Sequence, residues 1–597
     1  MGALNKRFLI ASAALLAVAI AVWAAIPSVT RSQSLAAQLP PGALLTIESP
    51  DFAALLRSWN ASPQQATWLK SANYSAFANS RLFSRLGDAQ SEFAGVAATK
   101  GGFDSAFLRQ VAGKESIFAW YDISKLEFLY ISHLPPGKTA NVELLQQRGT
   151  FSRRESGGTA FYVKTSSGSS SGDDSAGPST PRTIAFATRG DWIVLATRED
   201  LMANTLLLMQ AGSGTQSSEA TEGWYASAEA AGPARHGDLH MLLDLQRITA
   251  TPAFRTYWVQ RNVTDTRQYR AAVVDLYREP NSFREERVLL PNTAADTPAQ
   301  PDLAALEAIV PERAGVYRAI AAPSPETALA TLDEKLLTRA ARSSSTNVDA
   351  PVANLAVDHP GSADDLETRI DAVSATPEPA SSATAPLLSL LRANDVSAML
   401  SIDRTDPATG AFVPIRSAVI LQSSNPWNPA QLQAALLTAL RSRLTIGDLG
   451  LAWEPGSRAN ASCASLGPTH PLLLCVEGST AILANDAAFE DEILARRSAA
   501  PKTPQPATFI GGFRHTQERP GFARLSSALA QTAPTPAAKD TSGDDDAAST
   551  PGQTPDYFHG NIASLSNAFR SLATERVVER RDGPLTRQTV VYTWQPR

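Results

Sequence analysis

The sequence predicts an α+β protein in which two related lobes of antiparallel, hairpin-built sheets with intervening helices follow one N-terminal transmembrane helix. Three observations predict this class. Short apolar runs come in pairs separated by turn residues, as in β-hairpins. Segments with the helical spacing of apolar residues lie between these pairs. The order of pairs and helices in the first half of the chain recurs in the second half.

The N-terminus carries the segment that predicts the membrane helix. Residues 9–26 contain no charge and are preceded by Lys6 and Arg7. A helix of this length, at about 1.5 Å per residue, spans roughly 27 Å, which is enough to cross a hydrocarbon core. The basic flank keeps residues 1–8 in the cytoplasm and sends the rest of the chain to the other side.

A cleaved signal peptide is the alternative for this segment, because small residues stand at Val22 and Ala24, where a signal peptidase reads the chain. The apolar run is longer than the usual core of a signal peptide, which favours an uncleaved anchor. With or without cleavage after Ala24, the body is extracytoplasmic, and periplasmic if the cell has an outer membrane. The predicted location is the cell membrane, single-pass, with the N-terminal helix in the cytoplasmic membrane.

The composition bounds the class of protein and of partner. A chain of 597 residues is too long for one core, and a net charge of −5 argues against a nucleic-acid partner, since such partners are usually bound by basic domains. The 40 prolines fall partly in Ala/Ser/Thr/Pro tracts that predict long connections. Two of these tracts, residues 343–385 and 532–555, hold too few apolar residues to order themselves and are expected to be disordered insertions.

The first predicted lobe, residues 39–292, opens with LPPGALLTIESPDFAALLRSW, a strand that runs into a helix. The strand at 44–48 stops before a proline, and Asp51 is placed to cap the helix that follows. Glu48, the acid of this strand, has no partner that the sequence identifies. Three hairpins are expected further along the lobe, at 116–123 with 126–134, at 184–188 with 192–197, and at 271–277 with 283–290.

The second predicted lobe, residues 303–597, repeats this order. A weaker copy of the opening unit starts at Val310, 271 residues after Leu39. The last hairpin, TERVVERRDGPLTRQTVVYTW, matches VVDLYREPNSFREERVLL at an offset of 302. Matching elements between these two are the strands at 396–403 and 415–423, the helix at 429–444, the strands at 471–477 and 480–485, and the helix at 487–496. We interpret the shared order as an internal duplication whose second copy has longer loops.

The chain has two cysteines, Cys463 and Cys475, in ASCASLGPTHPLLLCVEG. They flank a turn at Gly467 and Pro468 before an apolar strand, so a local disulfide across a hairpin is expected in an oxidising compartment. The alternative is a pair of small buried hydrophobic side chains. A metal site is not expected there, because only His470 is close in sequence.

No motif predicts a reaction. The GSSSG run at 168–172 fits G-x-S-x-G but lies in a Ser/Gly/Asp tract, whereas a nucleophile elbow joins a strand to a helix. Phosphate-loop and dinucleotide-binding patterns are absent from the sequence. His236 and His240 are four residues apart, but Gly237 intervenes and HMLLDL predicts a strand, along which four residues span about 13 Å. We expect two surface histidines, and we predict no catalytic residue, no cofactor and no metal site.

Three stretches carry a resemblance: LPPGALLTIESPDFAALLRSW, SANYSAFANSRLFSRLGD and NIASLSNAFRSLATERVVERRDGPLTRQTVVYTW. They resemble a family of bacterial extracytoplasmic, membrane-anchored proteins that is catalogued as a domain of unknown function. The resemblance implies an N-terminal membrane segment and a duplicated α+β body. It brings no catalytic residues.

These features predict a single-pass, envelope-exposed scaffold or binding protein with an envelope protein as its partner. The alternative is a hydrolase of envelope polymer whose active site assembles in space, since catalytic residues need not be adjacent in sequence. The absence of a recognisable motif favours the binding role over the enzyme.

Overall fold

The computed structural model describes residues 34–69, 105–122, 125, 127–166, 182–211, 217–251, 266–293, 301–337, 382–406, 415–444, 451–456, 462–467, 471–497, 506–521, 524 and 572–594. The predicted membrane segment at 9–26, the GSSSG run, the insertion at 532–555 and most of that at 343–385 lie outside these residues. No helix among the described residues is long and apolar enough to cross a bilayer.

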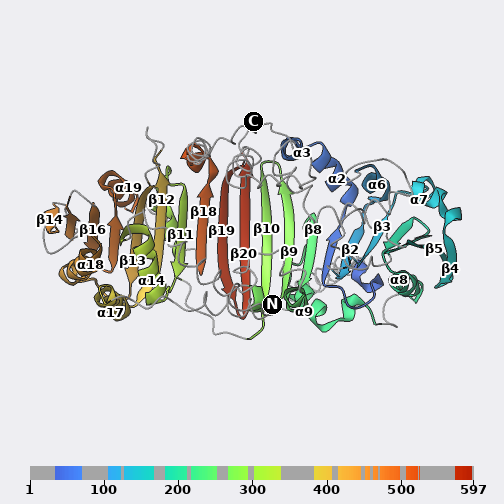
Figure 1. The fold of residues 1–597 in the computed structure, drawn as a ribbon, viewed down its shortest axis with the longest axis horizontal. Helices are drawn as coiled ribbons and strands as arrows, with labels where there is room; N and C mark the ends of the chain where they lie inside the picture. Colours follow the sequence, from blue (N-terminus) through green and yellow to red (C-terminus); the bar gives the residue numbers. More distant parts are fainter. Residues whose placement is uncertain are drawn as a thin grey trace, which may run out of the picture.

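Within these described residues, twenty strands form one continuous antiparallel sheet (Figure 1). Those of the first half of the chain are β1 (Leu45–Ser49), β2 (Ser116–Asp122), β3 (Glu127–His133), β4 (Ser152–Ser156), β5 (Thr159–Ser166), β6 (Arg182–Arg189), β7 (Trp192–Ala196), β8 (Leu239–Asp244), β9 (Tyr269–Glu279) and β10 (Ser282–Pro291). Those of the second half are β11 (Val316–Ala321), β12 (Val396–Thr405), β13 (Ile415–Ser423), β14 (Trp453–Gly456), β15 (Ser462–Leu466), β16 (Leu472–Glu477), β17 (Thr480–Ala484), β18 (Phe509–Arg514), β19 (Leu572–Asp582) and β20 (Leu585–Trp594).

The strand order is the same on both sides of the centre, where β10 and β20 lie side by side (Figure 1). Outward from β10 the pairings run β9, β8, β1, β2, β3, β7, β6, β5 and β4. Outward from β20 they run β19, β18, β11, β12, β13, β17, β16, β15 and β14. Each strand of the first half therefore occupies the place that the strand numbered ten higher occupies in the second.

Both faces of the sheet carry apolar cores in each half, because alternate side chains of a strand point to opposite faces. In β3, for example, Leu129 and Ile131 join one core, and Tyr130 joins the other. In the first half, one core lies under α2 (Phe52–Asn60), α6 (Ser105–Val111) and α7 (Glu143–Gln146), and the other under η1 (Leu35–Gln38), α8 (Glu199–Ala211) and α9 (Gly223–Ala231). In the second half, one core lies under α14 (Pro325–Leu332), α17 (Ala385–Asn394) and α18 (Pro429–Leu444), and the other under α13 (Leu303–Ala308) and α19 (Ala487–Arg497).

Two further α-helices among the described residues belong to the first half: α3 (Pro63–Leu69), which follows α2, and α10 (Leu245–Ala250), which follows β8. Asp51 caps α2 as expected, since its Oδ1 accepts from the N–H of Ala54 at 2.8 Å. The predicted helix at 429–444 is confirmed as α18.

The prediction that each lobe has its own sheet is wrong. Strands β10 and β20 pair over the eight positions from Ser282–Thr593 to Leu289–Thr586, which joins both halves into one sheet. These strands are ten residues each, and left unpaired they would expose long rows of backbone donors and acceptors. The insertion predicted at 343–385 also ends earlier than expected: Thr384 is 4% exposed and precedes α17, whose Leu387 and Leu391 are buried.

Candidate functional site

A group of polar side chains lies on the face of β1, β8 and β9 against which α9 packs. Glu48 on β1 stands opposite His240 on β8, which stands opposite Asp275 on β9. Opposite residues in antiparallel strands point to the same face, so these three side chains share it. Glu229 reaches the same place from α9. We call Glu229, His236, His240 and Asp275 the histidine cluster.

His240 stands at the centre of this cluster. Its Nδ1 lies 3.0 and 3.1 Å from the two carboxylate oxygens of Asp275, and its Nε2 lies 3.1 Å from Oε2 of Glu229. Nε2 of His236 lies 3.2 Å from Oε1 of Glu229. The side chains of His240 and Asp275 are 1% and 0% exposed, whereas those of His236 and Glu229 are 35% and 34% exposed. The cluster is closed at Asp275 and open to solvent at Glu229 and His236.

The geometry favours an imidazolium held between two carboxylates. Burial opposes a charge on His240, but its hydrogen bonds with Asp275 and Glu229 more than offset that effect and raise the pKa of His240 to about 9. Hydrogen bonds from His236 and His240 hold the pKa of Glu229 well below its ordinary value. In this state both ring nitrogens of His240 donate, one to each carboxylate, and neither is free to act as a base.

The expectation of two surface histidines is wrong for His240. His236 precedes β8, the chain bends at Asp238, and the two imidazole rings stack with centroids 3.7 Å apart. The N–H of Gly237 donates to Oδ1 of Asp275 at 2.8 Å, and a Cβ at Gly237 would lie 2.4 Å from the carbonyl oxygen of Leu276. The spacing of about 13 Å along a strand does not apply, because only His240 belongs to the strand.

Glu48 has neighbours that its sequence position does not reveal. The hydroxyl of Ser34 donates to Oε1 of Glu48 at 3.0 Å. Burial raises the pKa of Glu48, while the bond from Ser34 and the charge of His240 lower it. The acid of the opening strand therefore extends the polar group that the histidine cluster forms.

The cluster also has the donor atoms of a metal site. Glu229, His236 and His240 each offer one ligand atom, and the three atoms lie within 4.8 Å of one another. Two imidazoles and a carboxylate are a donor set that proteins use for zinc and other transition metals.

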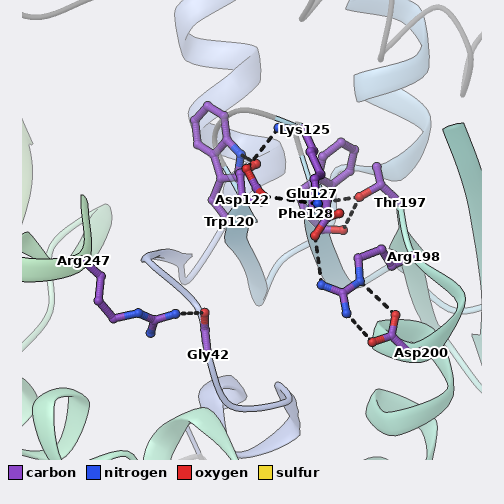
Figure 2. A network of polar contacts seen from close by, with 10 residues as sticks. All are labelled: Gly42, Trp120, Asp122, Lys125, Glu127, Phe128, Thr197, Arg198, Asp200 and Arg247. Carbon is purple, nitrogen blue, oxygen red and sulfur yellow. Dashed lines mark hydrogen bonds and ion pairs between the residues drawn. The ribbon is translucent and has the colours of Figure 1, made fainter. Parts of the chain in front are cut away.

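A second buried carboxyl, Glu219, holds the loop at the start of the opening unit. Oε2 of Glu219 accepts from the N–H groups of Gly42 and Ala43 at 2.7 and 2.9 Å, and the N–H of Glu219 donates to the carbonyl of Leu39 at 2.9 Å. Glu219 is fully buried, and burial raises its pKa to about 7 although the two N–H groups lower it. The guanidinium of Arg247 donates to the carbonyl of Gly42 at 2.8 Å (Figure 2). These contacts indicate that the LPPGA loop has a structural role.

Figure 2 also shows a polar network between β2, β3 and the start of α8. Arg198 donates to Glu127 at 2.9 Å and forms a two-pronged pair with Asp200. Thr197 accepts from the N–H of Phe128 at 2.8 Å. Because Arg198 is 40% exposed, its ion pairs contribute only modestly to the stability of the fold. They hold the geometry of the turn and do not create a reactive group.

No family model and no curated protein matches the chain. Among solved structures, crystal form I of TP0453 aligns with 45% of this chain and 82% of its own at 10% identity and a TM-score of 0.23. Crystal form III of TP0453 aligns with 44% and 81% at 10% identity and the same TM-score. A likeness at this TM-score carries no argument about fold or function.

The structure joins Cys463 and Cys475 in a disulfide between paired positions of β15 and β16. Sequence reasoning missed Glu229, Asp275 and Glu219. The sequence does contain a signal for Asp275, because this acid interrupts the apolar run AAVVDLY. An acid buried in a strand needs a partner. The sequence contains no such signal for Glu229 and Glu219, because both reach their partners only through the packing of the segment between β7 and β8.

Proposed function

We propose that the protein is a single-pass, envelope-exposed scaffold or binding protein with two related lobes, and that its partner is a protein of the cell envelope. The observation that supports this role is the uninterrupted twenty-stranded sheet. Each half packs cores on both faces of its own part of the sheet, and β10 and β20 connect the halves by backbone pairing. Such a sheet is a rigid frame that can hold two distant surfaces in fixed geometry.

The relation between the lobes is supported by the matching strand order about the β10–β20 pair. A symmetric two-chain assembly would pair the same strand of each copy at its centre. Here the two central strands, β10 and β20, are each the tenth strand of their half. Each is joined to the strand before it by a two-residue turn, Pro280–Asn281 in the first half and Gly583–Pro584 in the second. We infer that duplication and fusion of a ten-stranded unit produced the chain.

The extracytoplasmic location rests on the apolar residues 9–26 and on the disulfide. Disulfides persist in oxidising compartments and are rare in the cytosol. The Cys463–Cys475 bond therefore agrees with a body outside the cytoplasmic membrane.

An envelope-polymer hydrolase is the second candidate, and the histidine cluster is the feature that favours it. A buried Asp–His pair is a common part of catalytic sites. Against this role, Glu229 occupies Nε2 of His240, the nitrogen that would otherwise act as the base. We therefore place the binding role first.

The test is an affinity experiment with the tagged full-length chain, solubilised in mild detergent and incubated with envelope extract. The binding role predicts one partner retained in stoichiometric amount, which then binds the purified chain saturably. Release of soluble glycan fragments from purified envelope polymer, lost in the variant His240→Gln, would establish the hydrolase instead. Alkaline phosphatase fused to the C-terminus should be active if the body lies outside the cytoplasmic membrane, and an inactive fusion would reject that location.

A further inference from the structure

We propose that the histidine cluster is a binding site for one divalent transition-metal ion of the zinc class. Glu229, His236 and His240 would be its ligands, and Asp275 would orient His240 from behind. This site is independent of the scaffold or binding role proposed above.

Each of the two imidazole nitrogens already lies at a ligand-like spacing from a carboxylate oxygen of Glu229. Zinc lies about 2.0–2.2 Å from its nitrogen and oxygen ligands, so two ligands of one ion are roughly 3–3.5 Å apart. Nε2 of His236 lies 3.2 Å from Oε1 of Glu229, and Nε2 of His240 lies 3.1 Å from Oε2. The three ligand atoms lie within 4.8 Å of one another. Three protein ligands would leave a fourth position open to water or to a ligand group.

Asp275 supplies the contact that metal-bound histidines usually have. In metal sites the second ring nitrogen of a ligating histidine generally donates to a carboxylate or a carbonyl, which fixes the orientation of the ring. Nδ1 of His240 makes this bond to Asp275, and Asp275 is itself held by the N–H of Gly237 at 2.8 Å. The orienting contacts are therefore in place without the ion.

The charge of the site also suits a divalent cation. Asp275 and Glu229 bring two carboxylates to one buried imidazole. A buried charge is costly unless it is balanced nearby. The ion would displace the proton from Nε2 of His240 to solvent, and one divalent ion on neutral imidazoles would then balance the two carboxylates.

One side chain must move to complete the site. The stacked rings of His236 and His240 are parallel within 3°, so their Nε2 lone pairs do not yet point to one position. His240 is held by Asp275, whereas His236 lies outside the strand and is 35% exposed. A turn of the His236 ring about its own side-chain bonds would bring the two nitrogens to a common ion.

The test titrates Zn²⁺ into the metal-free, detergent-solubilised full chain in competition with a chromophoric chelator. We expect one equivalent to bind the unaltered chain. His236→Gln and Glu229→Gln should weaken that binding at least about tenfold, since even the loss of an orienting contact costs roughly ten- to hundredfold. His515→Gln is the matched control, because His515 also lies near a glutamate, Glu575, at 4.0 Å but outside the cluster. It should bind Zn²⁺ like the unaltered chain.

A second readout separates ligand loss from misfolding. Because the side chain of His236 is partly exposed, His236→Gln should unfold at the same temperature as the unaltered chain when no metal is present. Added Zn²⁺ should then raise the unfolding temperature of the unaltered chain and of His515→Gln, but not of His236→Gln. Absence of saturable binding, or equal binding by His236→Gln and the unaltered chain, would overturn the proposal.

Discussion

The buried carboxyl of Glu219 should make the opening loop less stable as the pH rises. Its pKa is raised from the ordinary 4.5 to about 7, because burial opposes the charged form more than the N–H groups of Gly42 and Ala43 favour it. The folded state therefore holds the proton of Glu219 more tightly than the unfolded state does. The stabilisation by this proton is complete below pH 4.5 and is lost as the pH rises to about 7. At about 1.4 kcal/mol per pH unit, the loss is about 3 kcal/mol.

The variant Glu219→Gln should remove this dependence. Glutamine has the shape of the protonated acid, and its Oε1 can accept from Gly42 and Ala43 at any pH. Oε1 of Glu219 has no hydrogen-bond partner within the described part of the chain, so the amide group displaces no existing contact. The nearby charges of Glu222 and Arg247 stay in place in both proteins.

Hydrogen–deuterium exchange of peptides covering residues 35–48 is the suitable assay, because a chain of this size need not unfold in one step. At pH 4, below both the ordinary and the raised pKa of Glu219, the two proteins should be protected equally. At pH 8 the variant should be protected about a hundredfold more, the factor that corresponds to about 3 kcal/mol. Glu115→Gln, which alters an exposed carboxyl of the same half, should match the unaltered chain at each pH. Equal protection of the unaltered chain and Glu219→Gln at pH 8 would refute the reasoning.

Three further predictions concern stability. Replacing Cys463 and Cys475 by alanine should lower the free energy of unfolding of the second half by about 3 kcal/mol, and an unchanged urea midpoint would contradict it. Gly237→Ala should cost about 1–3 kcal/mol, because its Cβ would meet a backbone carbonyl of β9; a thermal unfolding midpoint equal to that of the unaltered chain would show that the loop adapts. Asp51→Ala removes the acceptor for the N–H of Ala54 and should destabilise α2 by about 1 kcal/mol, measured as faster amide exchange confined to that helix.

The hairpins and the longer helices were predicted well from the sequence, because their apolar residues recur at the regular spacing of a strand or a helix. The hairpins 116–123 with 126–134 and 184–188 with 192–197 correspond to β2–β3 and β6–β7 within two residues at each end. Strands β4 and β14 were not predicted. Their sequences, SRRES and WEPG, have no apolar alternation, since both lie at the ends of the sheet, where most of their side chains are exposed.

The candidate site could be predicted only in part. His236 and His240 were visible as a pair, but their contact depends on the bend at Asp238 before β8 and on the packing of α9. Asp275 and Glu229 come from segments 35 and 11 residues away from His240. A single sequence carries no periodic signal for contacts of this kind, because they are set by which strands and helices become neighbours.

The two outermost strands of the sheet in the described part of the chain are poorly suited to pair with another strand. Strand β4 exposes Arg153, Arg154 and Glu155, and β14 is four residues long and contains Pro455. Charged side chains, prolines and short lengths are the usual means by which edge strands avoid pairing with another chain. The central strands β10 and β20 are ten residues long and are paired with each other. Strand addition at an edge is therefore a poor way for this protein to bind a partner, and a partner of the proposed scaffold should engage the faces or loops of the sheet instead.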